Sequence, residues 1–172
     1  MELVDIFDRD GNILETGRPR GIPPKAGEYL RAVGMWIVNS SGQVFITKRS
    51  PEKRYAPNKW ENPAGHVMSG EDSLAAVLRE VKEETGIAVL PQQVTFLGAS
   101  CAWPYLGRDY GVKMDFDIAA VKLQPGETCD ARWAEPSVFV QMMRGGEFAG
   151  SVTEHMRDYK ENFLKFTGLT EL

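Results

Sequence analysis

The sequence predicts an α/β fold in which a mixed β-sheet is packed between layers of helix. Short apolar and β-branched runs, which are typical of strands, occur on both sides of a central segment. In that segment the apolar residues recur at helical spacing, and two further helical stretches lie near the C-terminus. Strands on both sides of a central helix, followed by more helices, favour an α/β/α sandwich.

The first 31 residues are expected to form an extension ahead of the main body. Two short strands, residues 3–7 and 12–15, flank Asp8-Arg9-Asp10-Gly11, whose composition is typical of a hairpin turn. A loop rich in glycine and proline follows this hairpin. Because the hairpin is too short for a domain of its own, we expect one domain over residues 1–172, with its core in residues 32–172.

The core is expected to contain four more strands and three helices. The strands are predicted over residues 32–39, 44–49, 94–100 and 112–121, with a charged, proline-containing loop at 50–59. Ser69 is predicted to cap the central helix, with acidic residues in its first turn, and Gly86 is predicted to end it. Two closing helices are predicted over residues 137–143 and 151–166.

Composition narrows the possible partners. A formal charge of −4 argues against binding to nucleic acid polymers, because a phosphate backbone requires a basic protein surface. No apolar run is long enough to span a bilayer and the N-terminus lacks an apolar signal segment, so a cytoplasmic protein is expected. Cys101 and Cys129 are too few for a disulfide framework and are expected to be buried thiols.

Three acids share one side of the predicted central helix. Leu74, Val77, Leu78 and Val81 form the arc that faces the sheet, and Glu80, Glu83 and Glu84 lie beside it. Like charges at this spacing destabilise a helix by roughly 0.2–0.5 kcal/mol per pair, so a compensating cation is expected. Carboxylate oxygens suit hard cations such as Mg²⁺ or Mn²⁺. A solvated acidic face, partly neutralised by Arg79 and Lys82, is the alternative.

The surrounding residues favour the metal site. From Gly65 the chain runs five residues to Glu71, seven more, and then Arg79-Glu80-Val81-Lys82-Glu83-Glu84-Thr85-Gly86-Ile87. This segment resembles the Nudix box, G-x5-E-x7-R-E-U-x-E-E-x-G-U with U apolar, at every specified position, and a match over 23 residues is a strong signal. The resemblance implies a Nudix-type α/β/α sandwich and extends more weakly over most of the chain.

The resemblance also implies roles for individual residues. Glu80, Glu83 and Glu84 would hold Mg²⁺ or Mn²⁺, joined by the backbone carbonyl of Gly65 or of Ala64, and Arg79 would orient Glu80 by ion pairing. Glu80, Arg79 and Glu83 are therefore the expected catalytic residues. Bound metal would neutralise charge on phosphate oxygens and activate the water that attacks phosphorus.

The preceding segment resembles one branch of this superfamily. The stretch from Ile46 to Pro57, followed by Trp60-Glu61-Asn62, is similar to the corresponding stretch of isopentenyl-diphosphate isomerases. In that family a cation at the position of Arg49 and another at the position of Lys53 bind the substrate's diphosphate. The isomerase requires a cysteine immediately before the Gly-His pair, where this chain has Ala64. The resemblance therefore implies diphosphate binding without the isomerase's carbon chemistry.

Several assignments stay open at this stage. Glu127, in a glycine-containing turn, is expected either to act as an additional catalytic acid or to be solvated, with Asp130 and Glu135 as substitutes. His66 is either a metal ligand or a residue that hydrogen-bonds its loop. Trp60 is our candidate for stacking on a substrate ring, among other aromatics that are equally able to do so: Trp103, Tyr105, Tyr110 and Phe116.

The sequence thus predicts a metal-dependent pyrophosphohydrolase that cleaves a phosphoanhydride bond in a nucleoside diphosphate derivative or a similar small diphosphate. Two alternatives remain: an enzyme like isopentenyl-diphosphate isomerase, and a non-catalytic module that binds a nucleotide. Ala64 argues against the first, and the complete set of box acids argues against the second. The N-terminal hairpin is available either for a homodimer interface or to cover the pocket.

Overall fold

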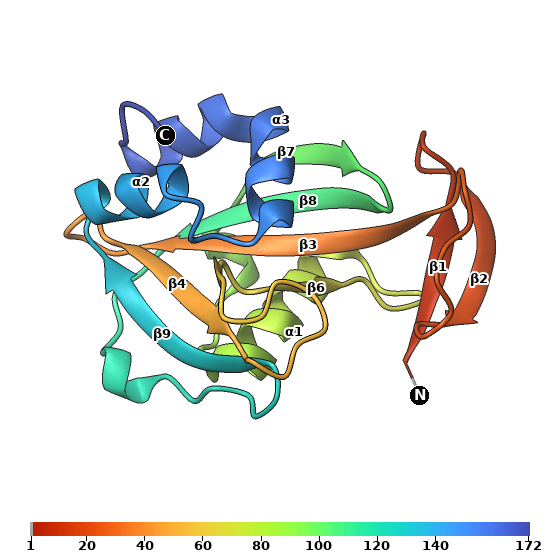
Figure 1. Ribbon diagram of the computed structural model, residues 1–172, viewed down its shortest axis with the longest axis horizontal. Helices are drawn as coiled ribbons and strands as arrows, with labels where there is room; N and C mark the ends of the chain where they lie inside the picture. Colours follow the sequence, from red (N-terminus) through yellow and green to blue (C-terminus); the bar gives the residue numbers. More distant parts are fainter. Residues whose placement is uncertain (1) are drawn as a thin grey trace.

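A computed structural model describes residues 2–172 and shows a single mixed β-sheet with helices on both of its faces (Figure 1). Helix α1 (Ser73–Thr85) packs on one face, while α2 (Pro136–Arg144) and α3 (Gly150–Thr167) lie on the other. The predicted α/β/α sandwich is confirmed. No helix within residues 2–172 is long and apolar enough to cross a membrane.

Strand β3 organises the sheet, because it pairs antiparallel with β1, β4 and β6 and parallel with β8. β7 adds to β8, β2 adds to β1, and β5 and β9 add to β4, all antiparallel. The nine strands of the described residues are β1 (Leu3–Phe7), β2 (Ile13–Pro19), β3 (Tyr29–Val38), β4 (Val44–Arg49), β5 (Trp60–Glu61), β6 (Ala64–His66), β7 (Val94–Ala102), β8 (Tyr105–Lys113) and β9 (Thr128–Ala134).

Two apolar cores, one on each face of the sheet, hold the layers together. Successive side chains of a strand point to opposite faces, so Met35 and Ile37 of β3 face α1 while Trp36 faces α2 and α3. The Trp36 ring packs edge-on against Phe139 of α2 and Phe163 of α3, at centroid distances of 5.7 and 4.9 Å. This packing fixes the long strand β3 between the helical layers.

Helix α1 begins later than predicted. Asp72, not Ser69, is its N-cap, and the Asp72 carboxylate accepts hydrogen bonds from the backbone N–H groups of Leu74 and Ala75, both at 2.9 Å. The first turn contains no acidic residue. The Ser69 hydroxyl instead donates to Asp5 of β1, at 2.6 Å. The prediction for Ser69 was wrong because a tertiary contact takes the side chain that the local pattern assigned to a cap.

The rest of α1 agrees with the prediction. Val77 and Val81 are fully buried against the sheet, and Leu74 and Leu78 pack partly buried on the same core. Gly86 ends the helix with a φ of 73°, a left-handed conformation that a residue with a side chain adopts at a cost. Glu80, Glu83 and Glu84 consequently lie on a helix that is capped at both ends.

The predicted strand over residues 112–121 was wrong in most of its length. Strand β8 lies earlier and ends at Lys113, and residues 118–120 form a 3₁₀ turn (η2) whose cap is the Asp117 side chain. Phe116 packs against Phe45 and Trp133, at centroid distances of 5.1 and 4.6 Å. Met114, Phe116 and Val121 are therefore partly buried by side-chain packing in an irregular segment, whereas Ile118 is exposed.

Candidate active site

The box folds as a loop and a helix placed against β6. Glu84, near the C-terminal end of α1, is buried with 6% of its surface exposed. Its carboxylate accepts a hydrogen bond from the backbone N–H of Ala64, at 3.2 Å. Burial raises the pKa of Glu84 well above its ordinary value, and the neighbouring Glu61 and Glu80 raise it further. Ionisation of Glu84 is therefore unfavourable at this buried position among other carboxylates.

Glu80 lies against the backbone of β6. A side chain at Gly65 would collide with the Glu80 carboxylate, so this close approach requires glycine. Burial raises the pKa of Glu80, while its hydrogen bond from Arg79 acts in the opposite direction. The arrangement brings Glu80 and the Gly65 backbone together.

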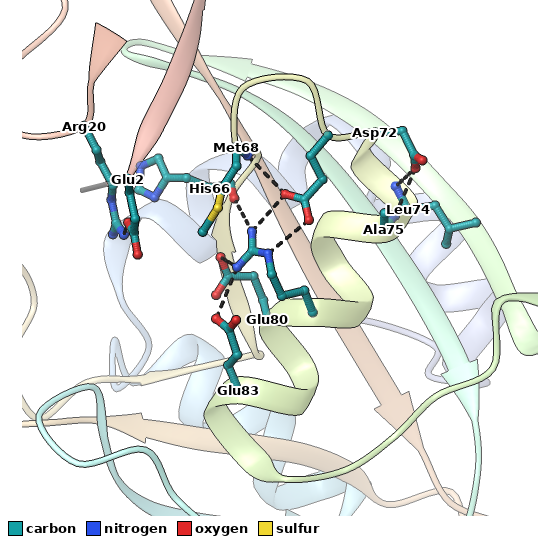
Figure 2. Close-up of polar contacts among 11 residues, drawn as sticks. Glu2, Arg20, His66, Met68, Asp72, Leu74, Ala75, Glu80 and Glu83 are labelled. Atoms are coloured by element: carbon teal, nitrogen blue, oxygen red, sulfur yellow. Dashed lines mark hydrogen bonds and ion pairs between the residues drawn. The ribbon is translucent and has the colours of Figure 1, made fainter. Parts of the chain in front are cut away.

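Arg79 connects most of the box (Figure 2). Its guanidinium donates to Glu80 at 2.8 Å, to Glu83 at 3.2 Å and to Glu71 at 3.0 Å. It also donates to the backbone carbonyl of His66, at 2.9 Å. The hydrogen bonds that Arg79 donates, first to Glu71 and then to Glu80, raise the pKa of its guanidinium, so the side chain stays charged. Arg79 thus holds the helix and the preceding loop in one geometry.

The three box acids are not assembled into a ready ligand set. The side chain of Glu83 is nearly half exposed and that of Glu80 is largely buried. Over residues 2–172, no group of three or more His, Cys, Asp or Glu side chains is arranged to hold a metal ion. Arg79 engages the carboxylates of Glu80 and Glu83, whereas Glu84 points toward Ala64. The predicted metal cluster therefore remains a proposal that requires these side chains to rearrange.

Glu61 is a site residue that sequence reasoning missed. It lies on β5, is 7% exposed, and receives an ion pair from Arg49 at 2.7 Å. Burial raises the pKa of Glu61, although Arg49 acts against this, and Glu61 in turn raises the pKa of Glu84. The sequence did contain a signal for this residue, because Trp60-Glu61-Asn62 belongs to the stretch that resembles the isomerases.

The two cations predicted to bind diphosphate both hold carboxylates near the box. Arg49 pairs with Glu61 and also donates to the backbone carbonyl of Tyr55, at 3.0 Å. Lys53 forms an ion pair with Glu127, so two residues predicted independently lie in contact. The hydroxyl of Thr128, the next residue, donates to the backbone carbonyl of Glu84 at 3.4 Å, so the turn that carries Glu127 lies beside the end of α1.

Trp60 lies away from these charged residues. Its ring is buried in the core on the α2 and α3 side, with the guanidinium of Arg132 at 4.5 Å and the amine of Lys48 at 5.6 Å from its centroid. No substrate ring can stack there without displacing these contacts. Tyr105 of β8, by contrast, packs its ring against His66 beside the box loop, and burial raises its pKa.

His66 lies on β6, next to the box loop. Burial lowers its pKa to about 4, so the ring is neutral at pH 7. Its Nδ1 atom is buried without a hydrogen-bond partner among the described residues. The ring meets Tyr105 edge-on at a centroid distance of 5.5 Å. Its backbone carbonyl, not its ring, is what Arg79 binds.

Comparison with known proteins identifies the family. A family model described as the NUDIX domain matches residues 28–156. The chain belongs to the Nudix hydrolase family. This Nudix hydrolase is 29% identical to an uncharacterized Nudix hydrolase of Listeria innocua, over 86% of this chain and 88% of that protein. It is also 29% identical to an isopentenyl-diphosphate Delta-isomerase of Corynebacterium diphtheriae, over 88% of each chain.

Two further similarities concern a shorter segment and the fold. Nudix hydrolase 3 of Arabidopsis thaliana is 35% identical over 50% of this chain, a match that spans only 11% of that protein. Among solved structures, DR0079 from Deinococcus radiodurans has a TM-score of 0.76 at 23% identity and covers 91% of this chain and 98% of its own. This likeness confirms the Nudix fold.

Proposed function

We propose that this Nudix hydrolase cleaves a phosphoanhydride bond in a nucleoside diphosphate derivative or a similar small diphosphate, with Mg²⁺ or Mn²⁺ as cofactor. The observation that carries the proposal is the buried group of Glu61, Glu80 and Glu84 beside two cations, Arg49 and Lys53. Carboxylates suited to a divalent cation therefore lie next to cationic side chains suited to a diphosphate.

The residues fit a divalent cation. Glu84 makes no ion pair among the described residues, and its pKa is raised by burial and then by three other carboxylates, those of Glu61, Glu80 and Glu127. Removing a charge from water without a counter-charge is strongly unfavourable, so a bound cation would stabilise this group. The ligand atoms of the box acids and of the Gly65 carbonyl are all oxygens, which favours Mg²⁺ or Mn²⁺ over softer metals. Glu80, Glu83 and Glu84, with the Gly65 carbonyl, would hold it.

The chain's own residues then have distinct tasks. Arg79 orients Glu80 and acts against burial, which raises the pKa of that carboxyl. Arg49 and Lys53 would exchange their carboxylate partners for phosphate oxygens, which bind Arg in a bidentate fashion and Lys as a point charge. Release from Lys53 would leave the carboxylate of Glu127 free to accept a proton. The metal supplies charge neutralisation on the phosphates and a more acidic water.

The reaction balances as a hydrolysis. The water oxygen forms a bond to phosphorus, the bond from phosphorus to the bridging oxygen breaks, and the proton passes to Glu80 or Glu127. The products are two phosphate-bearing fragments, or inorganic phosphate and one fragment. Isomerisation is disfavoured because Ala64 has no thiol at the position where the isomerase requires one.

Hydrolysis in ¹⁸O-labelled water tests the proposal. A panel of nucleoside diphosphate derivatives and isoprenoid diphosphates would be incubated with the protein and Mg²⁺. We expect one class to release phosphate-bearing products with label on phosphorus. Isomerisation of isopentenyl diphosphate without label, or return of every compound intact, would contradict the proposal.

A further inference from the structure

The N-terminal hairpin is fastened directly to the box. The backbone N–H of Ser69 donates to the carbonyl of Leu3, at 2.9 Å, and the Ser69 hydroxyl donates to Asp5, at 2.6 Å. Strand β1 also pairs with the start of β3 through Ile6 and Phe7. The hairpin therefore has a defined position relative to the loop between β6 and α1.

This attachment brings Arg20, just after β2, close to the box. Arg20 forms an ion pair with Glu2, and its backbone N–H donates to the carbonyl of the same residue at 3.0 Å. Figure 2 shows this pair beside His66 of β6. The Arg20 side chain is 42% exposed, so it is accessible to a ligand.

Arg20 shares its surroundings with Arg49, one of the two cations already assigned to diphosphate. Burial raises the pKa of Tyr105, and the charges of Arg20 and Arg49 both act against that rise. The Tyr105 ring meets the His66 ring edge-on at a centroid distance of 5.5 Å, so Tyr105 connects the surroundings of Arg20 with those of Arg49.

We propose that Arg20 is a substrate-binding residue that contacts a phosphate of the diphosphate, which makes the N-terminal hairpin part of the active site. This inference rests on the proposed function. Three cation–carboxylate pairs then surround the site: Arg49–Glu61, Lys53–Glu127 and Arg20–Glu2. In each pair the carboxylate holds the place that a phosphate oxygen takes when substrate binds, since both groups accept charge-assisted hydrogen bonds.

A purely structural role for the Arg20–Glu2 pair makes a different prediction. If the pair only fastened the end of the hairpin, Arg20→Gln and Glu2→Gln would have equal effects, because each removes the same interaction. If Arg20 binds phosphate, Glu2 competes with the substrate for it. Arg20→Gln should then raise KM by about tenfold or more, the effect of one lost hydrogen bond to a charged group. Glu2→Gln should leave KM unchanged or lower it.

The experiment compares the full-length parent with Arg20→Gln, Glu2→Gln and Arg9→Gln, the last at the hairpin turn. KM and kcat would be measured on the substrate that the panel identifies, and thermal midpoints would be recorded for each variant. We expect a raised KM for Arg20→Gln alone, with kcat changed less than KM. Equal KM values for Arg20→Gln and Glu2→Gln would overturn the inference.

A binding measurement separates this inference from the proposed function. Methylenediphosphonate, which cannot be hydrolysed, would be titrated calorimetrically into each protein in the presence of Mg²⁺. We expect weaker binding to Arg20→Gln and equal or tighter binding to Glu2→Gln. A parent that binds the probe but hydrolyses nothing would refute the proposed function alone. A parent that does not bind the probe, or an Arg20→Gln variant that binds it as the parent does, would refute the role of Arg20.

Discussion

Burial of Glu84 beside Glu61 and Glu80 makes its charge unfavourable in the metal-free protein. Glu84→Gln should therefore raise the thermal midpoint of the metal-free protein at pH 8, because the amide carries no charge to desolvate. The same variant should lose the stabilisation that Mg²⁺ gives the parent, and its turnover should fall by orders of magnitude. Calorimetric scans with and without Mg²⁺, together with turnover assays, would measure these effects.

Glu83→Gln is the matched comparison. Its side chain is nearly half exposed and paired with Arg79, so its loss should not stabilise the metal-free protein. Turnover should still fall, since we propose that Glu83 holds the metal. If Mg²⁺ raised the midpoint of Glu84→Gln as much as that of the parent, Glu84 would not be a ligand.

Asp109 is a buried acid on β8 that lies outside the box. Burial raises the pKa of its carboxyl from 3.8 to about 7, while a hydrogen bond with Tyr159 acts in the opposite direction. The folded state thus holds this proton more tightly than the unfolded chain does. Its contribution to stability is fully present below about pH 4 and is lost as pH rises to about 7.

We expect Asp109→Asn to remove that loss, so the free energy of unfolding of the variant should fall less steeply between pH 4 and pH 7. Urea unfolding at several pH values would measure the slope. Asp115→Asn is a control of opposite sign, because hydrogen bonds from Ser40 lower the pKa of Asp115. Identical slopes for the parent and Asp109→Asn would contradict the assignment.

At the scale of whole elements, the start of α1 shows where local patterns stop being sufficient. Ser69 and Asp72 are both good N-cap residues, and the sequence alone does not rank them. The ranking depends on Asp5, which binds the Ser69 hydroxyl from a strand 64 residues earlier in the chain. By contrast, the apolar spacing of α1 and its end at Gly86 are local properties, and both were predicted.

The two candidate caps can be separated by mutation. Asp72→Ala should destabilise the protein by about 1 kcal/mol, because two backbone N–H groups of α1 lose their acceptor. Ser69→Ala should leave α1 intact and loosen the hairpin instead, through the lost bond to Asp5. Hydrogen exchange at the N–H groups of Leu74 and Ala75 would distinguish the effects. Faster exchange there in Ser69→Ala than in Asp72→Ala would contradict this assignment.

For the molecule as a whole, the sequence predicts the layered architecture better than it predicts which distant segments lie in contact. Periodicity predicted the three helices, the sandwich and the strands β3, β4 and β7, but it missed β9 and most of β8. It does not say that β5 places Glu61 beside Glu84, or that the hairpin lies on the box loop, because both depend on pairing between distant segments. The motif predicted the box acids, whereas Glu61 and Arg20 required the folded chain. Trp60 was the candidate for stacking on a substrate ring because it is aromatic, but its ring is buried in the core.

The three cation–carboxylate pairs have a consequence for ionic strength. In each pair the carboxylate competes with the substrate for the cation. Substrate binding therefore replaces one ion pair with another at Arg49, Lys53 and Arg20, and the number of ion pairs stays the same. Added salt weakens the internal pair and the contact with phosphate alike. We therefore expect KM to rise only weakly between 50 and 500 mM KCl. In the Glu2→Gln variant one internal competitor is absent, and KM should rise more steeply with salt.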